Sequence, residues 1–453
     1  MRVLLTGATG MIGRKLAGKL WSDGHEVLGV SRDPDGAERE FPYPIRFISW
    51  DQRADSLKDV DIVIHLAGEP VAEGRWTAGR KKSIRDSRVK GTRGLVDAIA
   101  ALPAGQGPKA VISASAIGFY GDRGDEELGE RSAMGAGFLA EVCRDWELEV
   151  LKSSKLAERG VRVAAVRIGV VLAREGGALA RLTPLFRAGL GGPVGNGSQW
   201  MSWIHVDDLV SILARAVSDE SMEGVVNAVA PEPVTNAQFT RALGKALGKP
   251  AFLPAPRAAL RLAFGEMASV VLASQKVRPR VLEELGFEFA HPSIESAFEE
   301  LFPGGDEAFV AEQWVPHGIG QVFKFFSDAR NLEALTPPWL GFRMTAMSTG
   351  EIADATLIDY RLRIHGMPVS WRSRIEEWVP GERFVDSQVS GPYSRWHHTH
   401  TFEAAQGGTL IRDRVLYRLP LGALGSAMMG GKVRRDVSEI FKFRRSKIRE
   451  LFR

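Results

Sequence analysis

Three glycines spaced three residues apart near the start of the chain constrain its fold more than any other feature. Gly7, Gly10 and Gly13 follow an apolar run at residues 3–5 and precede residues 15–20, which begin an amphipathic helix. In a strand–turn–helix unit such glycines allow a tight turn, close approach of the backbone to a pyrophosphate, and close packing of helix on strand. The helix N-terminus adds free N–H groups and partial positive charge. The sequence therefore predicts a dinucleotide-binding turn.

Apolar strands alternate with helical stretches through the first part of the chain. We expect strands at residues 3–5, 27–30, 45–48, 61–68, 109–115 and 161–171, and helices at 84–102 and 137–159. This alternation predicts an α/β fold: a doubly wound parallel sheet with helices on both faces and ligands at the carboxyl ends of the strands.

The end of the second strand selects between the two nicotinamide cofactors. A carboxylate there would bind the ribose hydroxyls of NAD and repel a 2′-phosphate. This chain has Ser31 and Arg32 instead, and a guanidinium suits bidentate contact with phosphate. We therefore predict NADP(H), with NAD(H) as the alternative, because a shift of one residue would place Asp33 at this position. Arg32 as a solvated surface side chain is the other alternative.

Several motifs resemble the extended short-chain dehydrogenase/reductase superfamily, and within it the "epimerase family" subgroup often labelled SulA-like. They are the glycine turn, His65-Leu-Ala-Gly68, Leu66-Ala-Gly-Glu-Pro70, Arg75-Trp76, Ser87-Arg88, Ser113-Ala-Ser-Ala-Ile-Gly-Phe-Tyr-Gly121, Arg167-Ile-Gly169 and Trp203-Ile-His-Val-Asp-Asp-Leu209. The resemblance covers residues 1–302 and implies a Rossmann-type NADP(H)-binding domain with a helical C-terminal extension at about 250–302. It leaves the reaction open: an oxidoreductase or epimerase-like enzyme acting on an unknown small carbonyl or sugar-like substrate, or a non-catalytic NADP(H)-binding sensor or scaffold. The cofactor-binding residues that it implies are Gly7, Thr9, Gly10, Met11, Ile12, Gly13, Ser31, Arg32, Asp51, Leu66, Ala67, Gly68, Ser113 and Arg167.

The catalytic residues of the superfamily are only partly present. Its members pair a Ser or Thr at the end of the fifth strand with a Tyr-x-x-x-Lys on the next helix, where the lysine lowers the pKa of the tyrosine. Ser115 fits the serine role. The helix offers Leu139 and Cys143 at the Tyr and Lys positions, or residues 138 and 142 in the neighbouring register, and neither pair can relay a proton. The standard dyad is absent.

Two other residues are candidates for proton transfer or nucleophilic attack. Tyr120 is the phenol nearest to Ser115 in the sequence, and its alternative role is a packing tyrosine with a hydrogen-bonded hydroxyl. Cys143, the single cysteine, is on an apolar helical face, which is typical of an inert core thiol.

A long glycine-rich loop at residues 184–203 is expected to cover the substrate space. Arg187, Gln199 and Trp200 are its candidate substrate contacts, and a mobile surface loop is the alternative. A lid over the nicotinamide is what the resemblance implies.

The last third of the chain has a different order of elements. Residues 303–306 form a linker. A strand at 309–315, a helix at 319–326, six strand-like segments between 342 and 418 and a helix at 423–452 predict an antiparallel sheet wrapped around a helix, an α+β domain. Residues 323–339 resemble the START-like (SRPBCC, polyketide cyclase) superfamily. That resemblance covers residues 307–453 and implies a helix-grip fold with a cavity for a hydrophobic ligand.

Three features of this last domain have competing interpretations. His398 and His400 share one face of a strand, with His397 opposite, but no third zinc ligand can be identified, so we predict no metal site. The final helix is basic and has an apolar stripe, which we expect to pack on the sheet rather than lie on a membrane. The tryptophans of the domain suit an apolar cavity or a filled core.

Composition limits the remaining classes of function. The net charge is +4, and residues 432–453 hold nine Lys/Arg against three Asp/Glu, so the surplus is local and does not favour nucleic-acid binding. The first residue leads directly into a strand and no apolar run is long enough to cross a bilayer. With one cysteine in the chain, these features predict a cytoplasmic protein. The sequence does not identify an oligomeric state.

Overall fold

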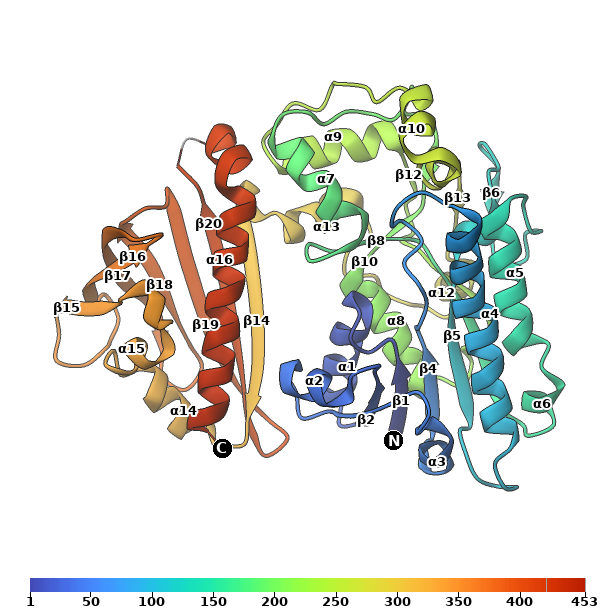
Figure 1. Cartoon of the computed structure of the whole chain (residues 1–453), viewed down its shortest axis with the longest axis horizontal. Helices are drawn as coiled ribbons and strands as arrows, with labels where there is room; N and C mark the ends of the chain where they lie inside the picture. The colour runs from blue at the N-terminus through green and yellow to red at the C-terminus, as the bar shows by residue number, and fades with distance from the viewer. Residues whose placement is uncertain (421, 453) are drawn as a thin grey trace. The chain divides into compact units, whose positions relative to one another are not determined.

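A computed structural model describes residues 1–420 and 422–452 of the chain. It divides into two compact units, Met1–Leu301 and Phe302–Arg453. Leu421 and Arg453, which the expected second domain includes, lie outside the described residues. Each unit is described by itself below (Figure 1).

The first unit is built on a parallel seven-stranded sheet in the order β11-β7-β5-β4-β1-β2-β3. Its strands are β1 (Arg2–Thr6), β2 (Glu26–Val30), β3 (Arg46–Ile48), β4 (Ile62–His65), β5 (Ala110–Ala116), β7 (Arg162–Ile168) and β11 (Gly224–Ala228). The strand order reverses beside β1, which places the expected ligand crevice at the carboxyl ends of β1 and β4.

Helices cover both faces of this sheet, with α4 packed on α5 and α1 packed on α8 (Figure 1). The helices of the unit are α1 (Met11–Ser22), α2 (Pro34–Glu40), α3 (Arg53–Ser56), α4 (Ala78–Ala100), α5 (Phe138–Leu151), α6 (Ser154–Ala157), α7 (Gly177–Arg187), α8 (Val206–Ser218) and α9 (Asn236–Ala246). Residues 250–301 add α10 (Arg257–Phe264), α11 (Ser269–Leu272), α12 (Arg280–Glu284) and α13 (Ile294–Leu301). Short strand pairs join β6 (Glu127–Leu128) to β13 (Lys276–Val277), β8 (Val170–Leu172) to β10 (Trp203–His205), and β9 (Trp200–Met201) to β12 (Val234–Thr235). The predicted doubly wound α/β fold is confirmed.

Three details differ from the predicted elements. The strand expected at 161–171 is broken at Gly169, where a Cβ atom would lie 2.9 Å from the carbonyl oxygen of Ser202. The helix expected at 137–159 ends at Leu151, and Ser153 caps the separate helix α6 by accepting a hydrogen bond from the N–H of Leu156. Serine favours such caps over helix interiors. The seventh strand, β11, was not predicted.

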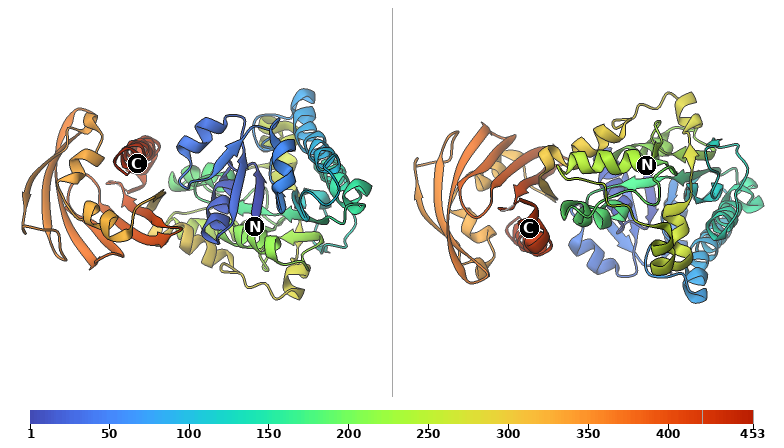
Figure 2. Two further views of the ribbon diagram at one scale, coloured as in Figure 1. Left: turned by 90° about the horizontal axis from the view of Figure 1, so that it is seen from below. Right: turned by 90° about the horizontal axis from the view of Figure 1, so that it is seen from above.

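The second unit is an antiparallel seven-stranded sheet in the order β14-β20-β19-β18-β17-β16-β15. Its strands are β14 (Glu307–Val315), β15 (Arg343–Met347), β16 (Leu357–Ile364), β17 (Met367–Val379), β18 (Arg383–Ser390), β19 (Arg395–Ala405) and β20 (Gly408–Arg418), and its helices are α14 (Ile319–Phe326), α15 (Asn331–Leu335) and α16 (Gly422–Leu451). Figure 2 views α16 end on and shows the sheet curving around it. The predicted helix-grip fold is confirmed.

The final helix buries its apolar stripe in its own unit. Val437 and Phe441 of α16 join Val415 and Tyr417 of β20 in one buried cluster, and Ile448 belongs to the main core of the unit. This packing is the arrangement that the sequence predicted for the stripe. Among the described residues, no helix combines the length and apolar character that crossing a bilayer requires.

Candidate cofactor and substrate site

The glycine turn between β1 and α1 has the geometry of an anion cradle. Gly7 has φ +72°, and a Cβ on it would lie 2.9 Å from the carbonyl carbon of Leu66. A Cβ on Gly13 would lie 2.1 Å from the carbonyl oxygen of Gly7, so the helix can approach the strand only without a side chain there. Within the described chain, no side chain caps the N-terminus of α1. The first N–H groups of any helix lack an intrahelical acceptor. Because no described side chain caps them here, they remain available to a phosphate.

A buried histidine fixes the loop that follows β4 beside this turn. The two ring nitrogens of His65 lie 2.7 Å from the hydroxyl of Thr6 and 3.0 Å from that of Thr92, and the Thr6 hydroxyl also accepts from the N–H of Ala67. Burial lowers the pKa of His65 to about 4, so the ring is neutral. This network links β1, β4 and α4 under the predicted cofactor residues Leu66, Ala67 and Gly68.

The side chains after β2 have separate roles. Asp33 caps α2, its carboxylate accepting a hydrogen bond of 3.0 Å from the N–H of Gly36. Ser31 donates to the Asp33 carbonyl and accepts from its N–H. Arg32 is exposed and forms no ion pair or hydrogen bond with any residue that the structure describes. The guanidinium of Arg32 is thus available to a ligand, whereas the Asp33 carboxylate already accepts a hydrogen bond from the chain.

The other predicted cofactor residues occupy different surroundings. Thr9 is exposed in the turn, and Met11 and Ile12 are half-buried at the start of α1. Asp51 is exposed just after β3. Ser113 is buried inside β5, opposite His65 in the β4–β5 register, with its hydroxyl bonded to the carbonyl of Ala114.

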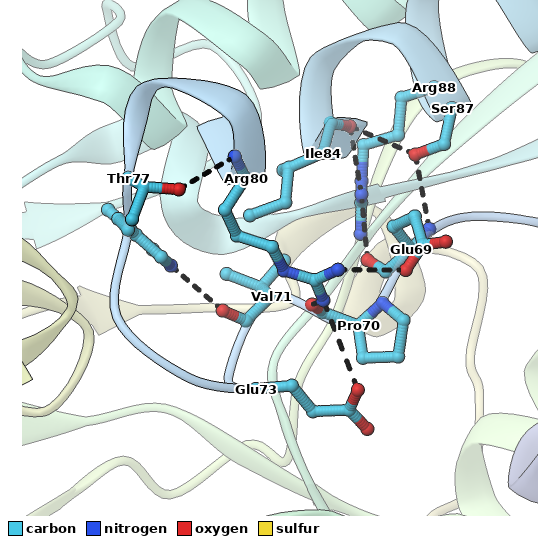
Figure 3. Close-up of polar contacts among 10 residues, drawn as sticks. Glu69, Pro70, Val71, Glu73, Thr77, Arg80, Ile84, Ser87 and Arg88 are labelled. Atoms are coloured by element: carbon cyan, nitrogen blue, oxygen red, sulfur yellow. Dashed lines mark hydrogen bonds and ion pairs between the residues drawn. The ribbon is translucent and has the colours of Figure 1, made fainter. Parts of the chain in front are cut away.

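Two arginines of α4 hold the loop after β4 in place (Figure 3). Arg88 donates to the carbonyl oxygens of Glu69 (3.0 Å) and Ile84 (3.1 Å). Arg80 forms an ion pair of 3.1 Å with the Glu69 carboxylate and donates to the carbonyl of Pro70. The Ser87 hydroxyl accepts from the Glu69 N–H. These contacts join the Leu66-Ala-Gly-Glu-Pro70 and Ser87-Arg88 motifs, so that the loop after β4 and the first half of α4 form one hydrogen-bonded corner.

A pocket of about 810 Å³ opens beside this corner. It is lined by the end of β5, the N-terminal half of α5, the β7–β8 junction and the helical extension at 257–275, and Ser115 and Arg88 are among its polar lining residues. Most of its lining side chains are apolar. A concave apolar site with few polar groups is typical of small-molecule binding.

Ser115 is tied to a buried ion pair behind the pocket. Its hydroxyl donates to Oε1 of Glu147 over 2.6 Å. The guanidinium of Arg167 grips both oxygens of the same carboxylate at 2.8 Å, and both of these charged side chains are nearly fully buried. Sequence reasoning missed Glu147. Its spacing could have revealed it. Glu147 lies four residues after Cys143 and eight after Leu139, so the three share one helical face, and that face is the one directed at Ser115.

Two predicted roles do not fit these contacts. Arg167 was predicted to bind cofactor, but its guanidinium is committed to Glu147, to the hydroxyl of Tyr120 (2.9 Å) and to the carbonyl of Glu130 (3.3 Å). Tyr120 is fully buried, hydrogen-bonded to Asn227 (2.7 Å), and is not in the pocket lining. Burial raises the pKa of its phenol. Both side chains are held by contacts inside the first unit, and their predicted site roles stay predictions.

The wall formed by α5 carries no proton-transfer group at the dyad positions. Leu139 and Cys143 both line the pocket, and a Cβ built on Gly118 would lie 3.3 Å from the Leu139 Cβ and 3.7 Å from the Cys143 Sγ. Burial raises the pKa of Cys143 to about 11. The neighbouring pair at 138 and 142 is apolar as well. The α5 wall is therefore chemically inert at neutral pH.

The predicted substrate contacts of the glycine-rich loop lie away from this pocket lining. Arg187 is buried in the last turn of α7, which extends three residues past Pro184 and shortens the loop. Gln199 is buried with its amide donating to the carbonyl of Val194 (3.3 Å). Trp200 donates its indole N–H to Asp125 (2.8 Å).

Comparison with known proteins places the chain. Residues 3–228 match the model of the NAD dependent epimerase/dehydratase family, residues 255–301 match a domain of unknown function (DUF1731), and residues 315–442 match "Polyketide cyclase / dehydrase and lipid transport". The chain is 42% identical to the chloroplastic epimerase family protein SDR39U1 homolog of Arabidopsis thaliana, over 66% of this chain and 86% of that protein.

Solved structures agree with this placement. The crystal structure of human SDR39U1 with NADPH superposes with TM-score 0.60 at 36% identity, covering 66% of this chain and 98% of that one. The nucleoside-diphosphate sugar epimerase of Corynebacterium glutamicum gives TM-score 0.53 at 39% identity over 66% of this chain and 57% of that one. The Arabidopsis relative, 42% identical, is covered over 86% of its length, and human SDR39U1, 36% identical, over 98%. This chain therefore belongs to the epimerase family that includes SDR39U1, with a polyketide-cyclase-like unit following it.

Proposed function

We propose that the first unit binds NADP(H) in preference to NAD(H). This proposal rests on the two charged side chains that follow β2. Arg32 forms no ion pair or hydrogen bond with any described residue, while the Asp33 carboxylate caps α2. A free guanidinium attracts a 2′-phosphate, and a carboxylate that is already satisfied competes less for ribose hydroxyls. The NADPH bound in the human SDR39U1 structure supports the same choice.

The residues of the chain fit such a cofactor. The turn at Gly7, Gly10 and Gly13 would hold the pyrophosphate at the start of α1, and Arg32 would contact the 2′-phosphate. The pocket beside Ser115 would receive the substrate. When bound, the cofactor supplies hydride transfer to or from a carbon atom.

Ser115 would orient the reacting oxygen of a small hydroxyl or carbonyl compound. Its only proton is directed at the Glu147 carboxylate, so the lone pairs of its oxygen are left to accept a hydrogen bond. That polarity favours a substrate that presents an O–H group. Arg167 holds the Glu147 carboxylate in position, and this carboxylate in turn fixes the direction of the Ser115 hydroxyl.

A second candidate function has its own supporting observation. The α5 wall carries Leu139 and Cys143 where the superfamily carries tyrosine and lysine, and this absence of an acid favours a non-catalytic NADP(H)-binding sensor or scaffold. In that case the polyketide-cyclase-like unit would hold a hydrophobic ligand, as the "lipid transport" description of its family model suggests.

Calorimetry on the full chain, stripped of nucleotide, tests the cofactor proposal. We expect NADPH to bind more tightly than NADH, and Arg32→Ala to weaken NADPH roughly tenfold to a hundredfold with little effect on NADH, the size of one charge-assisted contact. Arg39→Ala, an exposed arginine on α2, is the matched control and should change neither affinity. Equal losses for both nucleotides in Arg32→Ala would contradict the assignment.

Turnover separates the two candidate functions. The NADP⁺-loaded protein is offered a panel of small alcohols and sugars, and the NADPH-loaded protein is offered the matching aldehydes, ketones and keto sugars. Formation or oxidation of NADPH is followed by its near-ultraviolet absorbance. An enzyme should turn over at least one compound, and Ser115→Ala should lower kcat while leaving NADPH affinity unchanged. Tight NADPH binding with no turnover in either direction would favour the sensor.

A further inference from the structure

The second unit contains a compact cluster of two histidines and a carboxylate that the sequence did not reveal. His398 and His400 point to one face of β19, and Asp413 on β20 is paired with His400 in the β19–β20 register. Oδ1 of Asp413 lies 3.0 Å from Nε2 of His398 and 2.8 Å from Nδ1 of His400. Asp413 is the third candidate ligand that could not be identified from the sequence, and the strand register brings it to the two histidines.

The cluster lies inside the unit rather than on its surface. Each of the three side chains is less than a tenth exposed. The ring of Phe384 stacks on His400 with centroids 4.3 Å apart, and Phe441 of α16 packs against His398 at 5.6 Å. Two imidazoles and a carboxylate in such a dry site need either complete hydrogen bonding among themselves or a bound cation.

The surrounding charges leave room for a cation. Arg444 of α16 approaches Asp413 Oδ1 at 3.3 Å and His400 Nδ1 at 3.4 Å. Asp386, opposite His398 in the β18–β19 register, brings a second carboxyl group, and its buried Oδ1 has no hydrogen-bond partner among the described residues. Two carboxyl groups thus lie near one guanidinium, and one of their oxygen atoms has no hydrogen-bond partner among the described residues.

We propose that His398, His400 and Asp413 bind a divalent first-row transition-metal ion of the Zn²⁺ type. Two imidazoles and one carboxylate are a donor set used for such ions. Three protein ligands leave one coordination position open for water or for a bound small molecule. Metal–ligand bonds are about 2.0–2.2 Å. The Asp413 oxygen lies 2.8–3.0 Å from each histidine nitrogen, and all three ligand atoms lie within 4.8 Å of one another, so small side-chain movements would admit an ion. Arg444 would then donate to the ligating carboxylate from outside.

A second histidine cluster in the first unit does not have these properties. His205 and His291 lie near Asp207, but the His205 Nδ1 accepts a hydrogen bond from the Asp207 N–H at the start of α8. The Asp207 carboxylate is exposed and paired with Lys15 at 2.9 Å. It provides a control for the specificity of metal binding.

Metal titration of the full chain, with any purification tag removed and after chelator treatment, tests the proposal. Equilibrium dialysis with Zn²⁺ should give one tightly bound equivalent, and Co²⁺ should produce the visible absorption of a low-symmetry nitrogen–oxygen site. His398→Gln, His400→Gln and Asp413→Asn should each weaken binding by at least about tenfold. His397→Gln, on the opposite face of the same strand, and His291→Ala, in the other cluster, should leave it unchanged.

A measurement on the unmutated protein guards against variants that fail to fold. A metal that binds only the native state raises the unfolding midpoint in proportion to the logarithm of its concentration, so Zn²⁺ should shift the thermal transition upward. Absence of a stoichiometric metal and of this shift would overturn the proposal. So would tight binding that survives in folded His398→Gln and His400→Gln variants, or that is lost in His291→Ala.

Discussion

The closest approach in the nucleotide turn gives the sharpest prediction, Gly13→Ala. A Cβ at this position would lie 2.1 Å from the carbonyl oxygen of Gly7 and 2.8 Å from the Cα of Ala8, both backbone atoms that cannot rotate away. The first contact is 0.9 Å short of the 3.0 Å below which something must shift, so α1 has to move away from β1. Overpacking of this kind costs about 1–3 kcal/mol of unfolding free energy. It also displaces the helix N-terminus and should weaken NADPH binding.

Gly91→Ala is the matched control, because Gly91 lies inside α4 with nothing within 4 Å of the added Cβ. Helix propensity alone should make that variant more stable, by about 0.5–1 kcal/mol. Urea unfolding is followed on the transition that NADPH binding stabilises. The two alanine variants should change its free energy in opposite directions and differ by about 1.5–4 kcal/mol. A Gly13→Ala protein as stable as Gly91→Ala, with unchanged NADPH affinity, would refute the close-packing argument.

Three further predictions concern buried groups of the first unit. Burial lowers the pKa of His65 from 6.5 to about 4, so the unfolded chain takes up a proton that the folded one does not as pH falls from 6.5 to 4. This costs about 3 kcal/mol of stability over that range, and His65→Gln should flatten the pH dependence of urea unfolding accordingly. Glu147→Gln leaves the Arg167 guanidinium buried without its counter-ion and should cost roughly 3–5 kcal/mol in the same assay; Glu149→Gln, two residues along at an exposed pair, should change little. Cys143, buried with its pKa raised to about 11, should react with a disulfide reagent at pH 8 only after unfolding, and rapid reaction of the native protein would show that the thiol is accessible.

Local patterns were sufficient to predict the nucleotide turn and the elements around it. Gly7, Gly10 and Gly13 sit within one short segment, and the period of the apolar residues identifies β1 and α1 on either side. The same holds in the second unit, where helix α14 and the strands β15–β20 were predicted from spacing and turn residues. What these predictions share is that each depends on residues close together in the chain.

Contacts between distant segments were not predictable in this way. Ser115, Glu147 and Arg167 come from β5, α5 and β7, and only the packing of α5 on the sheet brings the carboxylate to the hydroxyl. Without that contact Arg167 had the features of a cofactor ligand. His400 and Asp413 are joined by a strand register that a shift of one residue would have broken.

Asp33 is the residue whose role the sequence left most open, and it gives a prediction with a clear sign. If its carboxylate serves only to cap α2, then asparagine, an equally good cap, should replace it with no change in stability or in the ratio of NADPH to NADH affinity. Asp33→Ala should lose about 1 kcal/mol with the cap, again without altering that ratio. If the carboxylate instead contacts ribose hydroxyls, both variants would weaken NADH selectively. Calorimetry with the two nucleotides distinguishes the outcomes, and a selective loss of NADH affinity in Asp33→Asn would mean that the carboxylate contacts the nucleotide as well as the Gly36 N–H.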